Sequence, residues 1–283
     1  MNTQMPSEIC PLLRHPWQIP PYDSFVWSSR THPWCVVIPV INEGERIRSL
    51  LSQMDTLGIA QVADILIVDG GSNDGSLDPD WLRSKYVCGL LVKQASGGLS
   101  AQLRCAYAYA LEQGYQGVIT IDGNDKDDPT AIPQFIDALC EGVDFAQGSR
   151  FITGGLAENT PKSRELAIRY VHAPLLRACS GFPWTDTTQG FRAYSRRMLL
   201  DARIAPFREV FVDYELLAYL SWQAPRLGYL CTEIPTSRRY PKGRAPTKIS
   251  SFRGNLNLLS VLVRTCLGHY SPRTDQENSD KIS

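Results

Sequence analysis

The sequence lacks an excess of charge of either sign, a long hydrophobic run and an N-terminal secretory pattern. Its 29 lysines and arginines balance 29 aspartates and glutamates, so we expect no nucleic-acid partner that covers the surface. No stretch approaches the roughly 20 apolar residues that a membrane-spanning helix needs. The first residues, MNTQMPSEICPLLRHPWQIPPYD, carry no basic start followed by an apolar core, which argues against a secretory signal.

Paired cysteine motifs and two common phosphate-binding motifs are also absent. The eight cysteines are scattered, without Cys-x-x-Cys spacing or a partnered histidine, which favours reduced thiols over a disulfide framework or a zinc site. No G-x-x-x-x-G-K-[ST] and no G-x-G-x-x-G occurs, so neither a P-loop nor the dinucleotide fingerprint is present. We expect a cytoplasmic protein that at most lies peripherally on the inner face of the cytoplasmic membrane.

Apolar runs alternate with amphipathic segments over the first half of the chain. The segments WCVVIPV, DILIVDGG, GVITID and DFAQGSR are typical of buried strands. Between them, Asn42 and Glu45 predict a capping box for one helix. Gly114 ends a second helix, and Asp128 with Pro129 opens a third. This alternation predicts an α/β fold with a mostly parallel sheet flanked by helices.

Three regions are predicted along the chain. Residues 1–33 form an extended arm rich in proline and aromatic side chains, and residues 34–250 form the main domain. Residues 251–283 form an amphipathic helix and a polar tail. Within the main domain the alternation loosens after Arg150, where we expect helices at 162–178, 196–203 and 213–224 and a strand at 228–236.

Each of the first four predicted strands ends in polar residues. These residues are Asn42 and Glu43, Asp69, Asp122, and Ser149 with Arg150. In open parallel α/β sheets, ligands bind beside the carboxyl ends of the strands. Polar loops are common at any single strand end, but four of them together predict a binding site at this edge of the sheet.

The segment TIDGNDKDDP, residues 120–129, gathers acidic and amide side chains directly after an apolar strand. Carboxylates are costly inside a buried strand, so we expect the cluster just beyond its end. Two interpretations remain open, a metal–diphosphate site and a solvated turn in front of a helix cap. Oxygen ligands of this kind suit Mg²⁺ or Mn²⁺.

Six segments of the chain form an ordered set, namely VVIPVINEGERIRSLL, ILIVDGGSNDGS, TIDGNDKDDP, FAQGSRF, DTTQGFRAYSRRML and EIPTSRRYPKGRAPTK. This set resembles the inverting family-2 glycosyltransferases, and within them it is most similar to the dolichyl-phosphate mannose synthase group. The resemblance covers roughly residues 34–250. It implies a glycosyltransferase with the nucleotide-sugar-binding α/β fold called GT-A.

The resemblance implies a nucleotide site and a metal site. The implied nucleotide-binding residues are Pro39, Asn42, Glu43, Asp69, Ser72, Asp122 and Gly123. Asp122 matches the first acid of the family's Asp-x-Asp, and Asn124 stands where the second acid is usual, so these two are the implied ligands of Mg²⁺ or Mn²⁺. An uncharged amide oxygen predicts weaker metal binding. The alternative register Asp125–Asp127 restores two acids but lies farther from the strand end.

The resemblance also implies phosphate-binding and catalytic residues. The implied phosphate-binding residues are Arg150, Arg164, Arg238, Arg239, Lys242 and Lys248. The implied catalytic residues are Asp122, Arg150, Asp186, Arg192 and Glu215. An exposed charged turn is the alternative interpretation of the basic run at 238–248. Glu215 could instead be a helix-face carboxylate paired with an arginine, Asp213 could serve as the base, and His172 is expected to pack in an apolar helix.

Together these features predict metal-dependent, inverting transfer of a sugar from a nucleoside-diphosphate sugar donor. Polyprenyl phosphate is the preferred acceptor, because a phosphate monoester is already anionic and needs no general base. Two alternatives stay open. The acceptor could be a soluble or saccharide hydroxyl, or the protein could bind nucleotide sugars without catalysis.

The final predicted helix, SFRGNLNLLSVLVRTCLG, carries an apolar stripe. Phe252, Leu256, Leu259, Val263 and Cys266 recur at helical spacing. Such a stripe either docks on its own domain or, beside the basic run, contacts an anionic membrane surface. Both interpretations remain open at this point.

Overall fold

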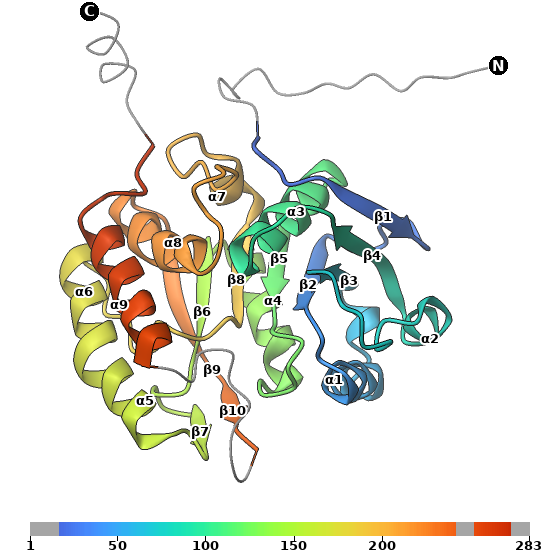
Figure 1. The fold of residues 1–283 in the computed structure, drawn as a ribbon, viewed down its shortest axis with the longest axis horizontal. Coiled ribbons are helices and arrows are strands. Elements are labelled where there is room, and N and C mark those ends of the chain that lie inside the picture. Colours follow the sequence, from blue (N-terminus) through green and yellow to red (C-terminus); the bar gives the residue numbers. More distant parts are fainter. Residues whose placement is uncertain (1–16, 242–251, 273–283) are drawn as a thin grey trace, which may run out of the picture.

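The computed structural model describes residues 17–241 and 252–272, with residues 252–256 described by their backbone only. Its centre is an eight-stranded sheet of order β1-β4-β3-β2-β5-β8-β6-β9, and β7 and β10 form a separate parallel pair (Figure 1). The strands are β1 (Tyr22–Val26), β2 (Trp34–Val40), β3 (Asp64–Asp69), β4 (Val87–Lys93), β5 (Gly117–Thr120), β6 (Phe145–Ser149), β7 (Leu156–Glu158), β8 (Arg192–Ser195), β9 (Cys231–Pro235) and β10 (Ser237–Arg239).

Within the large sheet, β1 and β8 run against the direction shared by the other six strands. The carboxyl ends of β2, β3, β5 and β6 therefore meet at one edge. The predicted α/β fold with a mostly parallel sheet is confirmed. Sequence reasoning missed strands β1, β4, β7, β8 and β10. Of these, β8 matters for the site because it brings the loop before Arg192 to this edge.

Helices cover both faces of the sheet (Figure 1). They are α1 (Glu45–Thr56), α2 (Pro79–Ser84), α3 (Leu99–Glu112), α4 (Ile132–Cys140), α5 (Lys162–Ala167), α6 (Ala173–Ser180), α7 (Arg196–Leu200), α8 (Glu215–Arg226) and α9 (Phe252–Cys266), with short turns at Ile59–Gln61, Pro129–Ala131 and Ile168–His172. Alternate residues of β2 serve two cores. Cys35 and Val37 pack with α3 and α8, while Val36 and Ile38 pack with α1 and α4.

Several predicted boundaries shift by a few residues. The helix predicted at 162–178 is α5, a π-helical turn and α6, and it ends at Gly181, whose φ of 76° stops the helix. The predicted capping box of α1 is wrong, because Gly44 occupies the N-cap and no side chain bonds there. Asn42 instead has a φ of 51° and accepts from Asn73 N–H on the neighbouring loop.

The described part of the predicted N-terminal arm lies along the edge of the sheet. Its strand β1 pairs antiparallel with β4. The ring of Trp17 packs against Phe207 with a centroid distance of 4.3 Å, and Arg104 donates to the carbonyl of Gln18. These contacts hold residues 17–26 on the main domain.

Helix α9 lies against α6 and α8 (Figure 1). Cys179 in α6 and Cys266 in α9 form a disulfide, with a Cα–Cα distance of 5.5 Å. The expectation of reduced thiols is wrong for this pair, because cysteines 87 positions apart meet only in the fold. Within residues 17–241 and 252–272, no helix is both long and apolar enough to cross a bilayer.

Candidate active site

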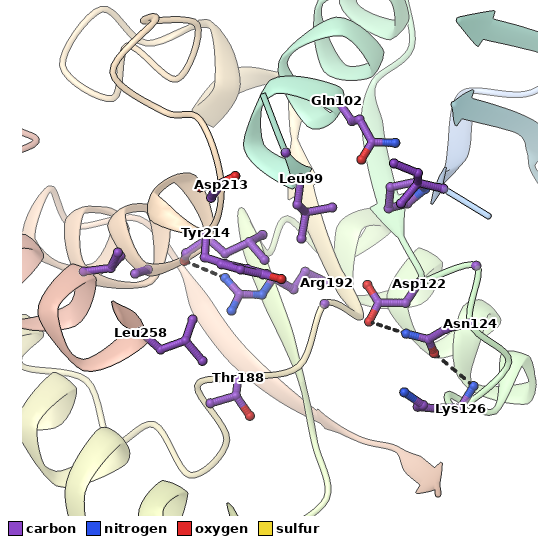
Figure 2. Close-up of a pocket in the computed structure, with 18 of the residues that line it drawn as sticks. Leu99, Gln102, Asp122, Asn124, Lys126, Thr188, Arg192, Asp213, Tyr214 and Leu258 are labelled. Carbon is purple, nitrogen blue, oxygen red and sulfur yellow. Dashed lines mark hydrogen bonds between the residues drawn. The ribbon is translucent and has the colours of Figure 1, made fainter. Parts of the chain in front are cut away.

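A cavity of about 550 Å³ opens at the carboxyl edge of the sheet (Figure 2). In the figure, Asp122, Asn124 and Lys126 lie on one side, while Tyr214 and Leu258 lie on the other. The polar lining includes Glu43, Arg46, Asp122, Asn124, Lys126, Arg164 and Arg238. The apolar lining includes Leu99, Leu176, Leu217, Leu258, Val261 and Leu262. The cavity thus joins the loops after β2 and β5 to a wall made by α3, α6, α8 and α9.

The loops after β2 and β3 are tied together by side chains. Asn42 N–H donates to Ser72 Oγ at 2.9 Å, and Gly44 N–H donates to Asp74 Oδ2 at 2.8 Å. Asp69 accepts from Ser72 N–H at 2.9 Å and from its hydroxyl at 2.6 Å. Asp69 and Ser72, two predicted nucleotide-binding residues, line a second hollow of about 380 Å³ together with Asp74, which sequence reasoning missed.

Four of the predicted nucleotide-binding residues, Pro39, Glu43, Asp122 and Gly123, line the main cavity. Glu43 is 8% exposed and forms an ion pair with Arg46 at 2.7 Å. A Cβ on Gly123 would lie 2.9 Å from Val40 Cγ2 and 3.1 Å from the carbonyl oxygen of Pro39. Glycine is therefore required where β5 leads into the acidic loop and the chain passes close to β2.

Gln102, a buried residue of α3 that sequence reasoning missed, holds the strand ends in place. Its side-chain amide donates to the carbonyls of Val40 at 2.8 Å and Val68 at 3.1 Å. A Cβ on Gly70 would lie 2.9 Å from the same amide nitrogen. The glycine at this position thus leaves room for Gln102 and lets β2 and β3 end at the same level.

Asp122 lies two residues after the end of β5 and lines the cavity, with 21% of its side chain exposed. Asn124 donates from its amide nitrogen to Asp122 Oδ2 at 3.3 Å, while its amide oxygen accepts from Lys126 N–H at 3.3 Å. A Cβ on Gly190 would collide with the Asp122 carboxylate. The loop before β8 can therefore pass over Asp122 only because it carries glycine there.

The second register of acids is not a ligand pair. Asp125 accepts from Gln53 at 2.8 Å on the exposed side of the loop, whereas Asp127 is 2% exposed. In the part of the chain that the structure describes, no three acidic, cysteine or histidine side chains gather as a metal site. Asp122 with its neighbouring amide still fits Mg²⁺ or Mn²⁺, since these ions prefer oxygen and complete their coordination with water and substrate phosphates.

Arg238 of β10 connects the two acids that point inward. Its Nη2 lies 3.3 Å from Asp122 Oδ2, and its Nη1 donates to Asp127 Oδ2. Asp127 Oδ1 accepts from the amide of Gln189 at 2.6 Å. Burial disfavours the charged guanidinium, but Asp127 and Asp122 outweigh this effect and raise the pKa of Arg238. Arg238 therefore remains a cation within the site.

Tyr240, also missed by sequence reasoning, is the centre of a cationic cluster. Arg164 Nη1 donates to the Tyr240 hydroxyl at 3.2 Å, Lys126 Nζ lies 5.3 Å from its ring centroid, and Arg238 Cζ lies 5.8 Å from that centroid. Burial alone would raise the pKa of Tyr240, but Arg238, Arg164 and Arg150 outweigh it and lower the pKa. Lys126, Arg164 and Arg238 all line the cavity, so this cluster suits an anionic ligand.

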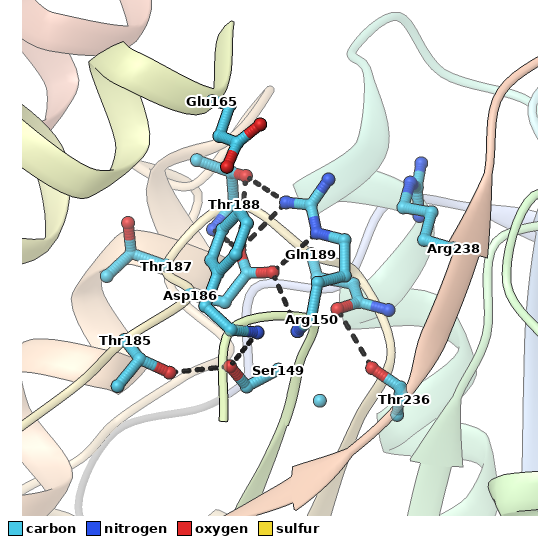
Figure 3. A network of polar contacts seen from close by, with 12 residues as sticks. Ser149, Arg150, Glu165, Thr185, Asp186, Thr187, Thr188, Gln189, Thr236 and Arg238 are labelled. Carbon is cyan, nitrogen blue, oxygen red and sulfur yellow. Dashed lines mark hydrogen bonds and ion pairs between the residues drawn. The ribbon is translucent and has the colours of Figure 1, made fainter. Parts of the chain in front are cut away.

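Arg150 and Asp186 form a buried, bidentate ion pair (Figure 3). The Nε and Nη2 atoms of Arg150 lie 2.6 and 2.9 Å from the two Asp186 oxygens, with side-chain exposures of 1% and 0%. Arg150 Nη2 also donates to Thr188 Oγ1 at 3.1 Å. Burial would raise the pKa of Asp186, but Arg150 lowers it. The predicted phosphate-binding role of Arg150 and catalytic role of Asp186 therefore do not match their contacts, which order the loop before β8.

Arg192, which was expected on the acceptor side, lines the cavity, but its guanidinium donates hydrogen bonds to other parts of the protein. It donates to the carbonyls of Gln189 at 2.9 Å, Leu217 at 2.7 Å and Thr187 at 3.2 Å, and to Ser221 Oγ at 3.0 Å. These bonds join β8 and its preceding loop to α8. Arg192 thus shapes the cavity wall instead of presenting its guanidinium to a ligand.

Asp213 and Glu215, the two candidate bases, have different positions. Glu215 accepts from the backbone N–H groups of Val212 at 2.9 Å and Asp213 at 2.6 Å, which closes the turn before α8. It does not line the cavity, whereas Asp213 does. Asp213 also packs against Gly98 at the start of α3. The predicted catalytic role of Glu215 is therefore not matched by its position.

The remaining predicted basic residues divide into three groups. Arg164 lines the cavity. Arg239 lies on β10 with its side chain 75% exposed, pairs with Glu158 and does not line the cavity, so its predicted phosphate-binding role is not matched by its position. Lys242 and Lys248 lie outside the described residues.

His172 lines the cavity, and burial together with Arg164 lowers its pKa. Its predicted role in packing is consistent with a half-buried side chain.

The buried face of α9 differs from the predicted stripe. Val261, Leu262 and Thr265 are buried against the domain, whereas Val263 is 40% exposed. The side chains of Phe252 and Leu256 lie outside the described residues. The helix therefore docks on its own domain through a face rotated from the one that sequence spacing predicted, and Val261 and Leu262 reach the cavity.

Comparisons with known proteins agree with this geometry. The family model described as Glycosyl transferase family 2 matches residues 35–202. Polyprenol monophosphomannose synthase of Mycolicibacterium smegmatis is 27% identical over 209 residues, which cover 71% of this chain and 75% of that protein. Dolichyl-phosphate hexose transferase of Haloferax volcanii is 28% identical over 232 residues, which cover 82% of this chain and 93% of that protein.

Solved structures share the fold. Glucosyl-3-phosphoglycerate synthase from Mycobacterium tuberculosis, in complex with Mn²⁺ and uridine-diphosphate-glucose, superposes with a TM-score of 0.61 at 18% identity. The match covers 87% of this chain and 81% of that chain. At this identity the similarity concerns the fold, which is the predicted GT-A architecture.

Proposed function

The chain belongs to glycosyl transferase family 2, as its motifs predicted, and we propose that it transfers a sugar, with inversion, from a nucleoside-diphosphate sugar to a polyprenyl phosphate. The relatives named for polyprenyl and dolichyl phosphates support this choice of acceptor. The observation that carries the proposal is that one cavity combines a polar, cationic side with an apolar wall. A phosphate with a hydrocarbon tail needs both surfaces at once.

The donor would bind where the loops after β2 and β5 meet. Glu43 and Gly123 line this part of the cavity, and Asp122 with Asn124 would hold Mg²⁺ or Mn²⁺. When bound, the metal neutralises charge on the departing diphosphate. Asn124 would have to turn its amide oxygen away from Lys126 N–H to serve as a ligand. Because that oxygen is uncharged, metal affinity should be lower than with two acids.

The acceptor phosphate would bind to the cationic cluster around Tyr240. Lys126 supplies positive charge from the loop after β5 and Arg164 from helix α5, and the Tyr240 hydroxyl accepts a hydrogen bond from Arg164 at 3.2 Å. An anionic phosphate oxygen can attack the sugar without losing a proton, so the reaction needs orientation and charge stabilisation more than a base. Asp213, which also lines the cavity, would then not need to act as the general base that a hydroxyl acceptor requires.

The hydrocarbon tail would lie along the apolar wall of the cavity. Leu217 of α8 and Leu262 of α9 are two of its members, and burying an isoprene unit against them is favourable. Exposed apolar side chains lie on α5, in the π-helical turn and directly after α9, where Leu166, Tyr170 and Leu267 are 55%, 73% and 72% exposed. We propose that these side chains contact the membrane that holds the acceptor, without a spanning helix.

One assay separates this function from its rivals. Purified protein is incubated with labelled nucleoside-diphosphate sugars and either a polyprenyl phosphate in vesicles, a soluble phosphate monoester or a saccharide, with Mn²⁺ and then with chelator. We expect metal-dependent labelling of the lipid, much weaker labelling of the soluble phosphate monoester and none of the saccharide. Labelling of the saccharide would favour a hydroxyl acceptor, and tight donor binding without turnover would favour a non-catalytic binder.

A further inference from the structure

Arg238 makes two unequal ion pairs at the proposed metal site. It bonds to Asp127, whose carboxylate is buried and also accepts from Gln189 at 2.6 Å. Its contacts with Asp122 are longer, at 3.3 and 3.4 Å. The Asp122 side chain is 21% exposed and the Asp127 side chain 0%. Asp127 is therefore the anchor of Arg238, and Asp122 is the partner that the guanidinium can leave.

A divalent cation on Asp122 would compete with this arrangement. A metal ion bound to the carboxylate stands about 2 Å from an oxygen, and one guanidinium nitrogen already lies 3.3 Å from Asp122 Oδ2. Two positive groups sharing one carboxylate repel each other, and the repulsion is strong where water is partly excluded. Both guanidinium contacts are to Oδ2, so a cation that binds this oxygen must displace Arg238 from it.

We propose that Arg238 is a resident counter-ion that competes with the metal for Asp122 and, once displaced, contacts the donor's diphosphate. The inference rests on the proposed function, because it takes Asp122 as a metal ligand. Arg238 would remain attached to Asp127 while its outer nitrogen moves from a carboxylate oxygen to a phosphate oxygen. The same side chain then opposes the metal alone and supports the metal together with diphosphate.

The opposite signs of these two effects make the inference testable. Arg238→Gln removes the charge and keeps a hydrogen-bonding side chain, and Arg238→Met is the second variant should the first not fold. Arg239→Gln is the matched control, since Arg239 follows on the same strand, carries the same charge and pairs with exposed Glu158. Folding of each variant is checked by its thermal midpoint before binding is measured.

Binding of Mn²⁺ alone is measured by electron paramagnetic resonance, and binding of inorganic diphosphate is measured by calorimetry with saturating Mg²⁺. Arg238→Gln should bind Mn²⁺ about tenfold more tightly, the order expected when a like charge leaves a partly exposed site. It should bind diphosphate at least about fivefold more weakly, because one charge-assisted contact is lost. Arg239→Gln should match the wild-type protein in both measurements.

The outcomes are distinguishable from failure of the proposed function. If the wild-type protein binds Mn²⁺ and Arg238→Gln binds it equally or more weakly, the inference is overturned while the metal site stands. Loss of both affinities in the variant would assign Arg238 a structural role and also overturn it. If the wild-type protein and both variants fail to bind Mn²⁺, the metal site and the inference fall together.

Discussion

Removing one partner of the Arg150–Asp186 pair should destabilise the protein far more than removing an exposed ion pair. Asp186→Ala would leave the guanidinium buried, without its two oxygens at 2.6 and 2.9 Å. Both side chains are at most 1% exposed, so water cannot replace the lost carboxylate. Breaking a buried pair of this kind costs about 3–5 kcal/mol.

The assay is urea unfolding followed by tryptophan fluorescence, supported by the thermal midpoint. The free energy of unfolding should fall by about 3–5 kcal/mol, and the thermal midpoint should fall on the order of 10 °C. Asp80→Ala is the control, because its pair with Arg83 is exposed by 83% and 53% and such pairs contribute less than about 1 kcal/mol.

A double variant tests whether the loss of stability in Asp186→Ala comes from the unpaired charge of Arg150. Arg150→Met with Asp186→Leu removes both charges and should recover a large part of the stability lost in Asp186→Ala, since an apolar pair of similar volume needs no counter-charge. A loss in Asp186→Ala no larger than in Asp80→Ala would refute the description of this pair as buried and structural. Arg150 would then again be a candidate phosphate ligand.

Three further predictions follow from the site. Asp122→Ala should reduce transfer by about a hundredfold or more and leave the thermal midpoint unchanged, whereas Asp125→Ala should not reduce transfer. Turnover of Asp122→Ala within about threefold of wild type would contradict the assignment of Asp122. Asn124→Asp should lower the metal concentration that gives half-maximal activity, because it adds a charge; an unchanged concentration would show that Asn124 is not a ligand. Burial, with Arg164 nearby, lowers the pKa of His172 below its unfolded value of about 6.5. As the pH falls, His172 is therefore protonated first in the unfolded chain, and stability is lost below about pH 6.5. His172→Gln should make the thermal midpoint fall less steeply between about pH 7 and 5. An equal slope in the wild-type protein and the variant would contradict this.

The parts of the fold that sequence predicts best are those with local causes. Apolar runs predicted β2, β3, β5 and β6. Asp128 begins the helical segment through Cys140 as predicted, and its side chain accepts from Thr130 N–H at 2.9 Å. Strand β8 was missed because RAYS is short and begins with an arginine. Arg192 fits there only because carbonyls from α8 and the preceding loop meet its guanidinium, and no local pattern reveals that.

Within the site, residue types were predicted better than partners. Asp122 and Arg164 line the cavity as the motifs implied. Arg150 carries the same charge as Arg164, yet its partner Asp186 lies 36 positions away, and sequence offers no rule for such a pairing. Tyr240 was not predicted, because a single tyrosine in a basic run forms no sequence motif and its cationic neighbours Lys126 and Arg164 come from other segments of the chain. The disulfide of Cys179 and Cys266 was missed for the same reason of sequence distance.

The central claim is that one cavity takes both the phosphate and the tail of a polyprenyl phosphate. The measurement that tests it most directly is the ratio of kcat/KM for a polyprenyl phosphate to kcat/KM for a tail-less phosphate monoester, with the same donor and in the same detergent. Burying even one isoprene unit against Leu217 and Leu262 should favour the lipid by at least about a hundredfold. That ratio should fall in Leu258→Asp, at a partly buried residue of the same wall, while transfer to the tail-less phosphate persists. Equal kcat/KM values for the two acceptors in the wild-type protein would contradict the claim.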